Sequence, residues 1–173
     1  MTVQNYYHYL TLARRDLWTF LESLPDDVLS KSVLPGERMH SMKDLMLHIA
    51  VVEDSWIHED ILRDSPVWES ATGFPHEYEK PYHDAKTLEW LLTYWKAVES
   101  STRSYLETLN DTELERGVTV PSPRGDELLT VDSLLWHVLQ HETRHTAQLM
   151  MLGRLVGFAP PQLDLVKYLP LSR

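Results

Sequence analysis

Hydrophobic residues recur along most of the chain at alternating intervals of three and four positions, which places them on one face of an α-helix. In the first such stretch Tyr6, Leu10 and Ala13 share a face. The same spacing returns in three later stretches, whereas none shows the strict alternation of a half-buried strand. The pattern therefore predicts an all-α fold with four long helices, over about residues 3–24, 41–62, 84–109 and 130–156.

The expected helix starts reveal a faint internal repeat. Ser41 is the expected N-cap of the second helix, and Thr130 or Asp132 that of the fourth. A hydroxyl cap thus precedes a histidine by seven residues in both halves of the chain, at His48 and at His137. The repeat predicts two helix hairpins that together form a four-helix bundle.

Proline and glycine mark the connections between these helices. Residues 63–83 contain three prolines and a glycine and form a long crossover between the two hairpins. Asp84 is the expected cap of the third helix. Residues 25–40 and 110–129 form the other two connections, and Gly157 ends the fourth helix. The proline-rich tail that begins at Phe158 is expected to lie extended along the bundle.

The composition restricts the kinds of function. A chain of 173 residues, 43% hydrophobic and 24% charged, suits one domain over residues 1–173. Without an apolar run of membrane-spanning length or a visible secretory signal, a cytoplasmic protein with no membrane partner is expected. A net charge of −10 disfavours nucleic acid as a partner. The absence of cysteine excludes disulfides, thiolate metal sites and a cysteine nucleophile.

Polar residues interrupt the hydrophobic face of the fourth helix. The residues that share this face are Leu134, Val138, His141, His145, Gln148, Leu152 and Leu155. Burying an imidazole is costly unless a hydrogen bond or a metal ion satisfies it. His141 and His145 stand four residues apart on one side of the helix and can bind one ion together. Metal binding is therefore favoured over the alternative, two core histidines that are only hydrogen-bonded.

A third ligand must come from another helix. His48 is the best candidate, because it lies in mid-helix beside the hydrophobic face of the second helix. His137, one turn before His141, is expected in a core or supporting role. The remaining histidines fall at helix ends, in loops or on the surface and are weak candidates: His8, His40, His58, His76 and His83.

Two familiar metal motifs are present only in part. His141 to His145 spells H-E-x-x-H, the zinc-protease motif, but no Glu follows Glu142 and no His follows His145 to supply the third ligand. A di-iron bundle needs E-x-x-H on two helices. The second copy, at residues 37–40, falls before the expected cap Ser41, in a turn. Both interpretations are disfavoured.

A third pattern, one histidine from the second helix with H-x-x-x-H from the fourth, resembles the DinB/YfiT-like family of metal-binding four-helix bundles. The resemblance rests on residues 41–56 and on W-H-V-L-Q-H-E-T-R-H-T-A-Q at 136–148, and continues through 152–157. Length, helix order and the long second crossover also agree. The family commonly has a second histidine where this chain has Arg144, and often glycine where it has Ala147.

The resemblance implies that His48, His141 and His145 bind a divalent metal, with water or substrate completing the shell. Three imidazole ligands suit zinc or nickel, and affinity alone does not separate these ions. Glu142 is the expected catalytic residue, because its place beside the ligand face can bring it to a metal-bound water. A solvent-facing helix residue is the alternative for Glu142.

The resemblance also implies an enzyme of the thiol S-transferase type. In such an enzyme the metal activates a low-molecular-weight thiol, such as bacillithiol or mycothiol, for attack on a small electrophilic substrate. Because the chain lacks cysteine, the thiol must come from a cosubstrate. A homodimer is implied as well. Aromatic residues of the crossover can wall a pocket over the metal: Trp68, Phe74, Tyr78 and Tyr82.

Two other functions stay open. One is a metal-dependent hydrolase, and the other is a noncatalytic, stress-related metal-binding bundle. A site closed by a fourth protein ligand, for instance His137 or Gln148, favours the noncatalytic function, whereas an open position favours an enzyme.

Overall fold

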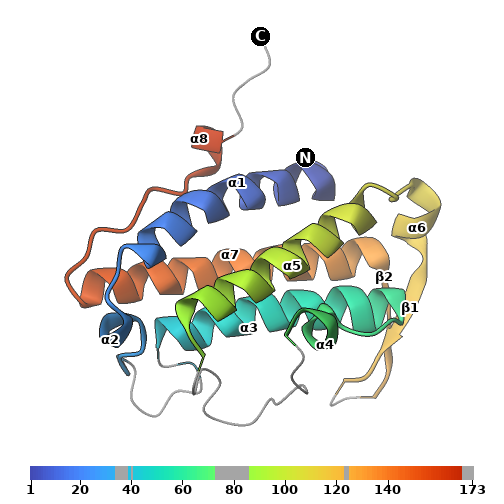
Figure 1. Ribbon diagram of the computed structural model, residues 1–173. Helices are drawn as coiled ribbons and strands as arrows, with labels where there is room; N and C mark the ends of the chain where they lie inside the picture. Colours follow the sequence, from blue (N-terminus) through green and yellow to red (C-terminus); the bar gives the residue numbers. More distant parts are fainter. Residues whose placement is uncertain (34–38, 40, 73–85, 123–124, 169–173) are drawn as a thin grey trace.

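The computed structural model describes residues 1–33, 39, 41–72, 86–122 and 125–168 of the chain. Its four long helices are α1 (Val3–Glu22), α3 (Met42–Asp54) with its continuation η1 (Ser55–Leu62), α5 (Leu88–Leu106) and α7 (Val131–Leu155). α3 contacts both α5 and α7, and α1 contacts the same two helices (Figure 1). The predicted all-α fold class is confirmed, apart from one short hairpin.

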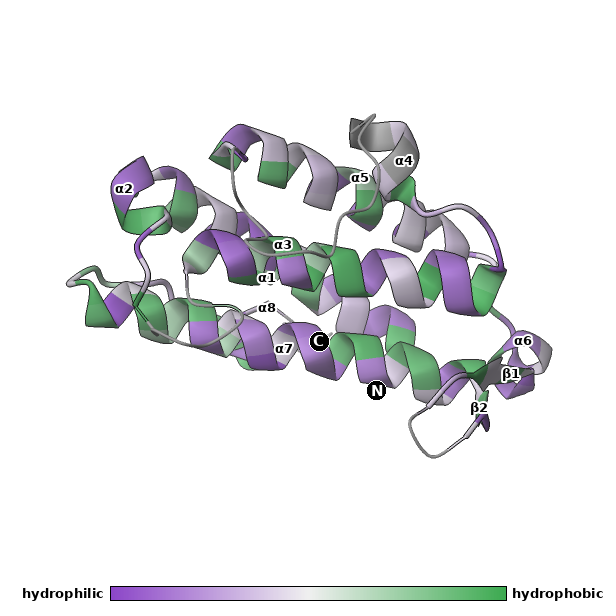
Figure 2. Cartoon of the chain, turned by 90° about the horizontal axis from the view of Figure 1, so that it is seen from below, coloured by the Kyte–Doolittle hydropathy of each residue, from purple (hydrophilic) through white to green (hydrophobic). Residues whose placement is uncertain are grey.

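The hydrophobic faces of these helices form two buried clusters, one toward each end of the bundle. The first cluster includes Leu21 and Trp95, and the second includes Leu10, Ile57 and Leu135. Seen from below, the long helices each carry both hydrophobic and hydrophilic residues, as amphipathic spacing in the sequence predicts (Figure 2). Each cluster takes side chains from α1, α5 and α7, so burial at both ends holds the same helices together.

The helix starts follow the predicted caps. The Ser41 hydroxyl accepts the Asp44 amide at 3.1 Å, and the Asp44 carboxylate accepts the Ser41 amide at 3.0 Å, so a capping box opens α3. Thr130 caps α7 by accepting the Ser133 amide at 3.2 Å. The third helix begins later than expected, after a cap at Thr87. The predicted cap Asp84 lies outside the described residues.

The second helix continues to Leu62 as predicted, but its geometry changes on the way. Over Ser55–Leu62 it has the wider π-helical form. Arg63 ends this segment in the left-handed conformation, with a φ of 57°. A π-helix of this length is rare, because its hydrogen bonds and packing are less favourable than those of an α-helix.

A two-stranded antiparallel hairpin precedes α7, in the stretch expected to be irregular. β1 (Gly117–Val120) pairs with β2 (Glu127–Thr130). Val118 and Val120 are buried and belong to the second cluster. The expectation of no strand was therefore wrong. Each strand has only four residues, too few for an alternating pattern to be distinguished in the sequence.

Within the described residues, short helices occupy the connections and the tail: α2 (Asp26–Leu29), α4 (Val67–Thr72), α6 (Asp111–Glu115) and, in the tail, α8 (Leu165–Tyr168). α4 lies within the long crossover and places Trp68 against Trp90 and Tyr94, with ring centroids 5.3 and 4.9 Å apart. Trp68 thus packs in the first cluster, and it does not form the expected wall over a metal. The other crossover aromatics, Phe74, Tyr78 and Tyr82, lie outside the described residues.

The tail after α7 runs back along α1, as predicted (Figure 1). The Tyr9 hydroxyl donates to the Leu163 carbonyl at 2.6 Å. Lys167 and Tyr168 both bind the Asp16 carboxylate, at 2.7 and 2.6 Å. None of the helices in the described ranges has the length and apolar character needed to cross a membrane.

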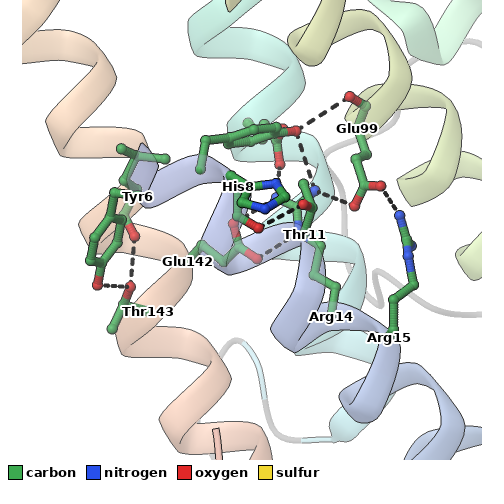
Figure 3. Close-up of polar contacts among 11 residues, drawn as sticks. Tyr6, His8, Thr11, Arg14, Arg15, Glu99, Glu142 and Thr143 are labelled. Atoms are coloured by element: carbon green, nitrogen blue, oxygen red, sulfur yellow. Dashed lines mark hydrogen bonds and ion pairs between the residues drawn. The ribbon is translucent and has the colours of Figure 1, made fainter. Parts of the chain in front are cut away.

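A buried ion cluster lies between the two hydrophobic clusters. Arg14 of α1 binds Glu53 of α3 at 2.6 Å, Glu99 of α5 at 3.0 Å and Glu142 of α7 at 2.6 Å. The four side chains are no more than 5% exposed. Figure 3 shows Arg14 between Glu142 and Glu99, with Arg15 bound to Glu99. One guanidinium therefore connects the first long helix to the other three.

We expect Arg14→Met to lower the free energy of unfolding by about 3–5 kcal/mol, because it leaves three carboxylates buried without their shared cation. Arg15→Met is the matched control. It removes a cation whose side chain is 48% exposed, so we expect a loss below about 1 kcal/mol. Denaturant unfolding of both variants measures the difference, and equal losses would contradict a dominant role for the buried guanidinium.

Candidate metal centre

The three histidines predicted as ligands come together between α3 and α7. His48 belongs to α3, while His141 and His145 belong to successive turns of α7. One ring nitrogen from each lies within 4.8 Å of the other two. The Nε2 atoms of His48 and His141 are 3.0 Å apart. Zinc–nitrogen bonds of about 2.0–2.1 Å hold tetrahedral ligand atoms roughly 3.3 Å apart, so this group could hold a metal ion once its wider nitrogen separations shorten.

The rings of the cluster converge from two helices. The ring centroid of His48 lies 4.8 Å from that of His141 and 4.8 Å from that of His145. His141 is 9% exposed and His145 is 7% exposed, and His48 is half-buried. Within the described ranges, no fourth His, Cys, Asp or Glu joins this group. A metal ion held by these three residues would keep a coordination position for water or substrate, as in catalytic rather than structural zinc sites.

Burial keeps the imidazoles of His141 and His145 in the form that binds metal. Removal from water, together with the neighbouring His145 and His48, lowers the pKa of His141 to about 3. Burial also lowers the pKa of His145, although its hydrogen bond to Gln148 acts in the opposite direction. Neutral imidazole is the ligand form, so at neutral pH His141 and His145 need not lose a proton to bind an ion.

Gln148 orients one of the three rings. The Nδ1 atom of His145 lies 2.5 Å from the Gln148 Oε1 atom, which is an acceptor, so Nδ1 carries the proton and Nε2 is left for a metal. Gln148 is itself exposed, and Leu155 is 61% exposed, so both were wrongly assigned to the buried face. Leu149, which is fully buried, takes the core position instead.

His137 lies beside the cluster without joining it. Its ring packs against Trp56 at 5.0 Å and lies 6.3 Å from the ring of His141. The side chain is exposed, so the expected core position was wrong. Partial burial still lowers the pKa of His137. The contact with His141 places the His137 ring at the edge of the histidine cluster, where it can support the ligand His141.

Glu142 points to the other side of α7, into the buried ion cluster. Arg14 donates to both carboxylate oxygens, from Nε at 2.7 Å and from Nη2 at 2.6 Å. Burial raises the pKa of Glu142, although Arg14 opposes this shift. The residue is 3% exposed, so the solvent-facing alternative was wrong. The expected catalytic role gains no support from these contacts, because the guanidinium already occupies both oxygens.

The remaining histidines differ in their surroundings. His8 is exposed, as expected. His58, set aside for its position near a helix end, is 5% exposed and hydrogen-bonded to Asp54 and Ser101. The four-residue spacing of Asp54 and His58 was the only sequence signal of this contact. The other weak candidates, His40, His76 and His83, lie outside the described residues, as does most of the partial di-iron motif at 37–40.

Comparison with protein-family models gives a match to the DinB family. Its model matches residues 1–172, nearly the whole chain. The chain belongs to the DinB family. Comparison with curated proteins gave no match. Membership of the DinB family and the three-histidine cluster together fit a metal-binding protein.

We expect Gln148→Ala to weaken metal affinity about 10- to 100-fold, because His145 loses the acceptor that fixes its ring and tautomer. Competition with a chromophoric chelator measures the affinity. Gln140→Ala changes an exposed residue of the same type on the same helix and serves as the control. Equal affinities in the two variants would rule out the orienting role of Gln148.

Proposed function

We propose that this DinB protein is a metal-dependent enzyme of the thiol S-transferase type. The observation that carries the proposal is the convergence of His48, His141 and His145, whose ligand nitrogens lie within 4.8 Å of one another. Zinc and nickel are the ions proposed for this centre, since both suit imidazole ligands. The proposed partners are a small electrophilic substrate and a low-molecular-weight thiol cosubstrate.

The donor set supports an open, reactive site. A divalent ion held by three imidazoles acts as a Lewis acid and lowers the pKa of a water or thiol in its remaining position. The sequence contains no cysteine, so a thiol nucleophile has to enter as a separate molecule. The acidic net charge of −10 favours neutral or cationic electrophiles over polyanions.

In this mechanism the protein's own residues would bind the metal ion and orient its ligands. His141 and His145 present neutral nitrogens from one helix face, and His48 presents the third from α3. Gln148 fixes the tautomer of His145. Glu142 is not assigned an acid–base role, because Arg14 occupies its carboxylate. A cytoplasmic location and a homodimer stay predictions from the sequence.

Metal content tests the ligand assignment. We expect purified wild-type protein to carry about one zinc or nickel ion per chain, and His48→Ala, His141→Ala and His145→Ala each to lose most of it. His137→Ala is the matched control, since His137 lies beside the cluster but outside the ligand group. Elemental analysis by mass spectrometry gives the ratio. Metal that persists in all three variants would overturn the assignment.

A conjugation assay tests the reaction class. We expect the metal-loaded protein to accelerate coupling of a low-molecular-weight thiol to a chromogenic aryl halide, and the metal-free protein and His141→Ala to lose this acceleration. The thiol panel should include bacillithiol, mycothiol and glutathione. Metal binding without conjugation of any thiol would refute the transferase and favour the noncatalytic function. Metal-dependent hydrolysis of an ester without conjugation of any thiol would favour the hydrolase.

A further inference from the structure

Three residues outside the metal centre form a continuous series of hydrogen bonds where α3 and η1 meet α5. The His58 Nδ1 atom lies 2.8 Å from Oδ1 of Asp54 and 3.1 Å from the Asp54 carbonyl. The His58 Nε2 atom lies 2.7 Å from the hydroxyl of Ser101. Asp54 and His58 are 1% and 5% exposed, and Ser101 is half-buried. The order carboxylate, imidazole, hydroxyl is that of a serine nucleophile with its base and orienting group.

Asp54 is held in place from several directions. Its carboxylate accepts the amides of Val67 and Trp68 at 2.8 and 2.9 Å and the hydroxyl of Tyr94 at 2.7 Å. Burial alone raises its pKa, but the hydrogen bonds from His58, Tyr94 and the backbone bring the pKa below the ordinary value. Asp54 is therefore an ionised acceptor with a fixed position.

This fixed carboxylate decides which nitrogen of His58 carries the proton. An anionic acceptor at Nδ1 holds the proton there, so Nε2 of the neutral ring presents its lone pair to Ser101. Although burial lowers the pKa of His58, the hydrogen bond and charge of Asp54 outweigh it and raise this pKa above the ordinary value. In the neutral ring, which prevails at a pH above that pKa, the serine hydroxyl donates to Nε2 across the 2.7 Å between the two atoms. In this arrangement the imidazole is within reach to take the hydroxyl proton when the oxygen attacks an electrophile.

The backbone at His58 is also unusual. His58 lies in the middle of the π-helical segment Ser55–Leu62, which ends at the left-handed Arg63. π-Helical turns are less favourable than α-helical ones and occur frequently at functional sites. The form of η1 is a second observation, independent of the hydrogen bonds, that points to this position.

We propose that Ser101 is an activated nucleophile, with His58 as its base and Asp54 as the positioning residue, that reacts with small activated acyl compounds such as esters. The Ser101 oxygen attacks the carbonyl carbon while its proton passes to Nε2 of His58. The carbon–oxygen bond to the leaving alcohol then breaks, and the alcohol takes that proton. Water, activated in the same way, cleaves the resulting acyl-serine, releases the acid and restores the hydroxyl.

A fluorophosphonate probe tests this without knowledge of the natural substrate. Its phosphorus forms a bond to the serine oxygen and loses fluoride, and His58 takes the proton. We expect Ser101 of the wild-type protein, at about pH 8, to be labelled roughly 100-fold or more faster than Ser104, as general-base assistance provides. Ser104 is an internal control, being exposed on the same helix with its hydroxyl donating to the Ser100 carbonyl at 3.1 Å. Peptide mass spectrometry assigns the labelled residue.

The variants separate an activated serine from one that only connects two helices. We expect Ser101→Ala to abolish the fast label and His58→Gln to slow Ser101 to the rate of Ser104. Ser104→Ala should leave the label on Ser101 unchanged, because the Ser104 hydroxyl donates to the Ser100 carbonyl and takes no part in the series. Equal rates for Ser101 and Ser104 in the wild type would overturn the proposal, and that comparison requires no variant to fold. An unchanged rate in folded His58→Gln would overturn it as well.

Discussion

The arrangement of the bundle depends on one buried cation. Arg14 contacts a carboxylate from each of the other three long helices, and its burial would be costly without them. Burial alone would lower the pKa of Arg14. The charges of Glu142 and Glu53 more than offset this effect and hold the pKa of Arg14 above its ordinary value. The guanidinium therefore stays charged, and its geometry restricts how each helix can rotate about its axis.

This restriction reaches the metal centre through α7. Glu142 binds Arg14 on the face of α7 toward α1, while His141 and His145 lie within about 100° around the same helix and face α3. Because adjacent residues of a helix point about 100° apart, fixing Glu142 also fixes the direction of His141. Glu53 acts similarly on α3, five residues after His48. A contact that takes no part in metal binding thus brings the ligands into reach of one ion.

The hydrophobic periodicity and the caps predicted the long helices, and histidine spacing with the family resemblance predicted which three histidines meet. The sequence could not identify contacts between residues that lie far apart along the chain. Nothing near Glu142 in the sequence identifies Arg14, 128 residues away, as its partner, so the sequence indicates only a catalytic role for Glu142. Gln148 and Leu155 were wrongly expected in the core, because the repeat does not fix which of two adjacent positions turns inward, and Leu149 and Leu152 are the buried residues of this part of α7. The contact between His58 and Ser101 depends on the packing of η1 against α5, which no local pattern encodes.

The polar layer between the two hydrophobic clusters has a consequence for folding. Hydrophobic faces alone tolerate a helix that slides by one turn, about 5.4 Å, because leucines replace leucines. Such a slip of α7 would take Glu142 away from Arg14 and His141 away from His48 in the same movement. A packing in which α7 is shifted by one turn therefore leaves a buried charge unpaired, whereas the native packing pairs it. The sequence thus excludes the wrong registers by charge, and the ligand geometry follows from the same alignment.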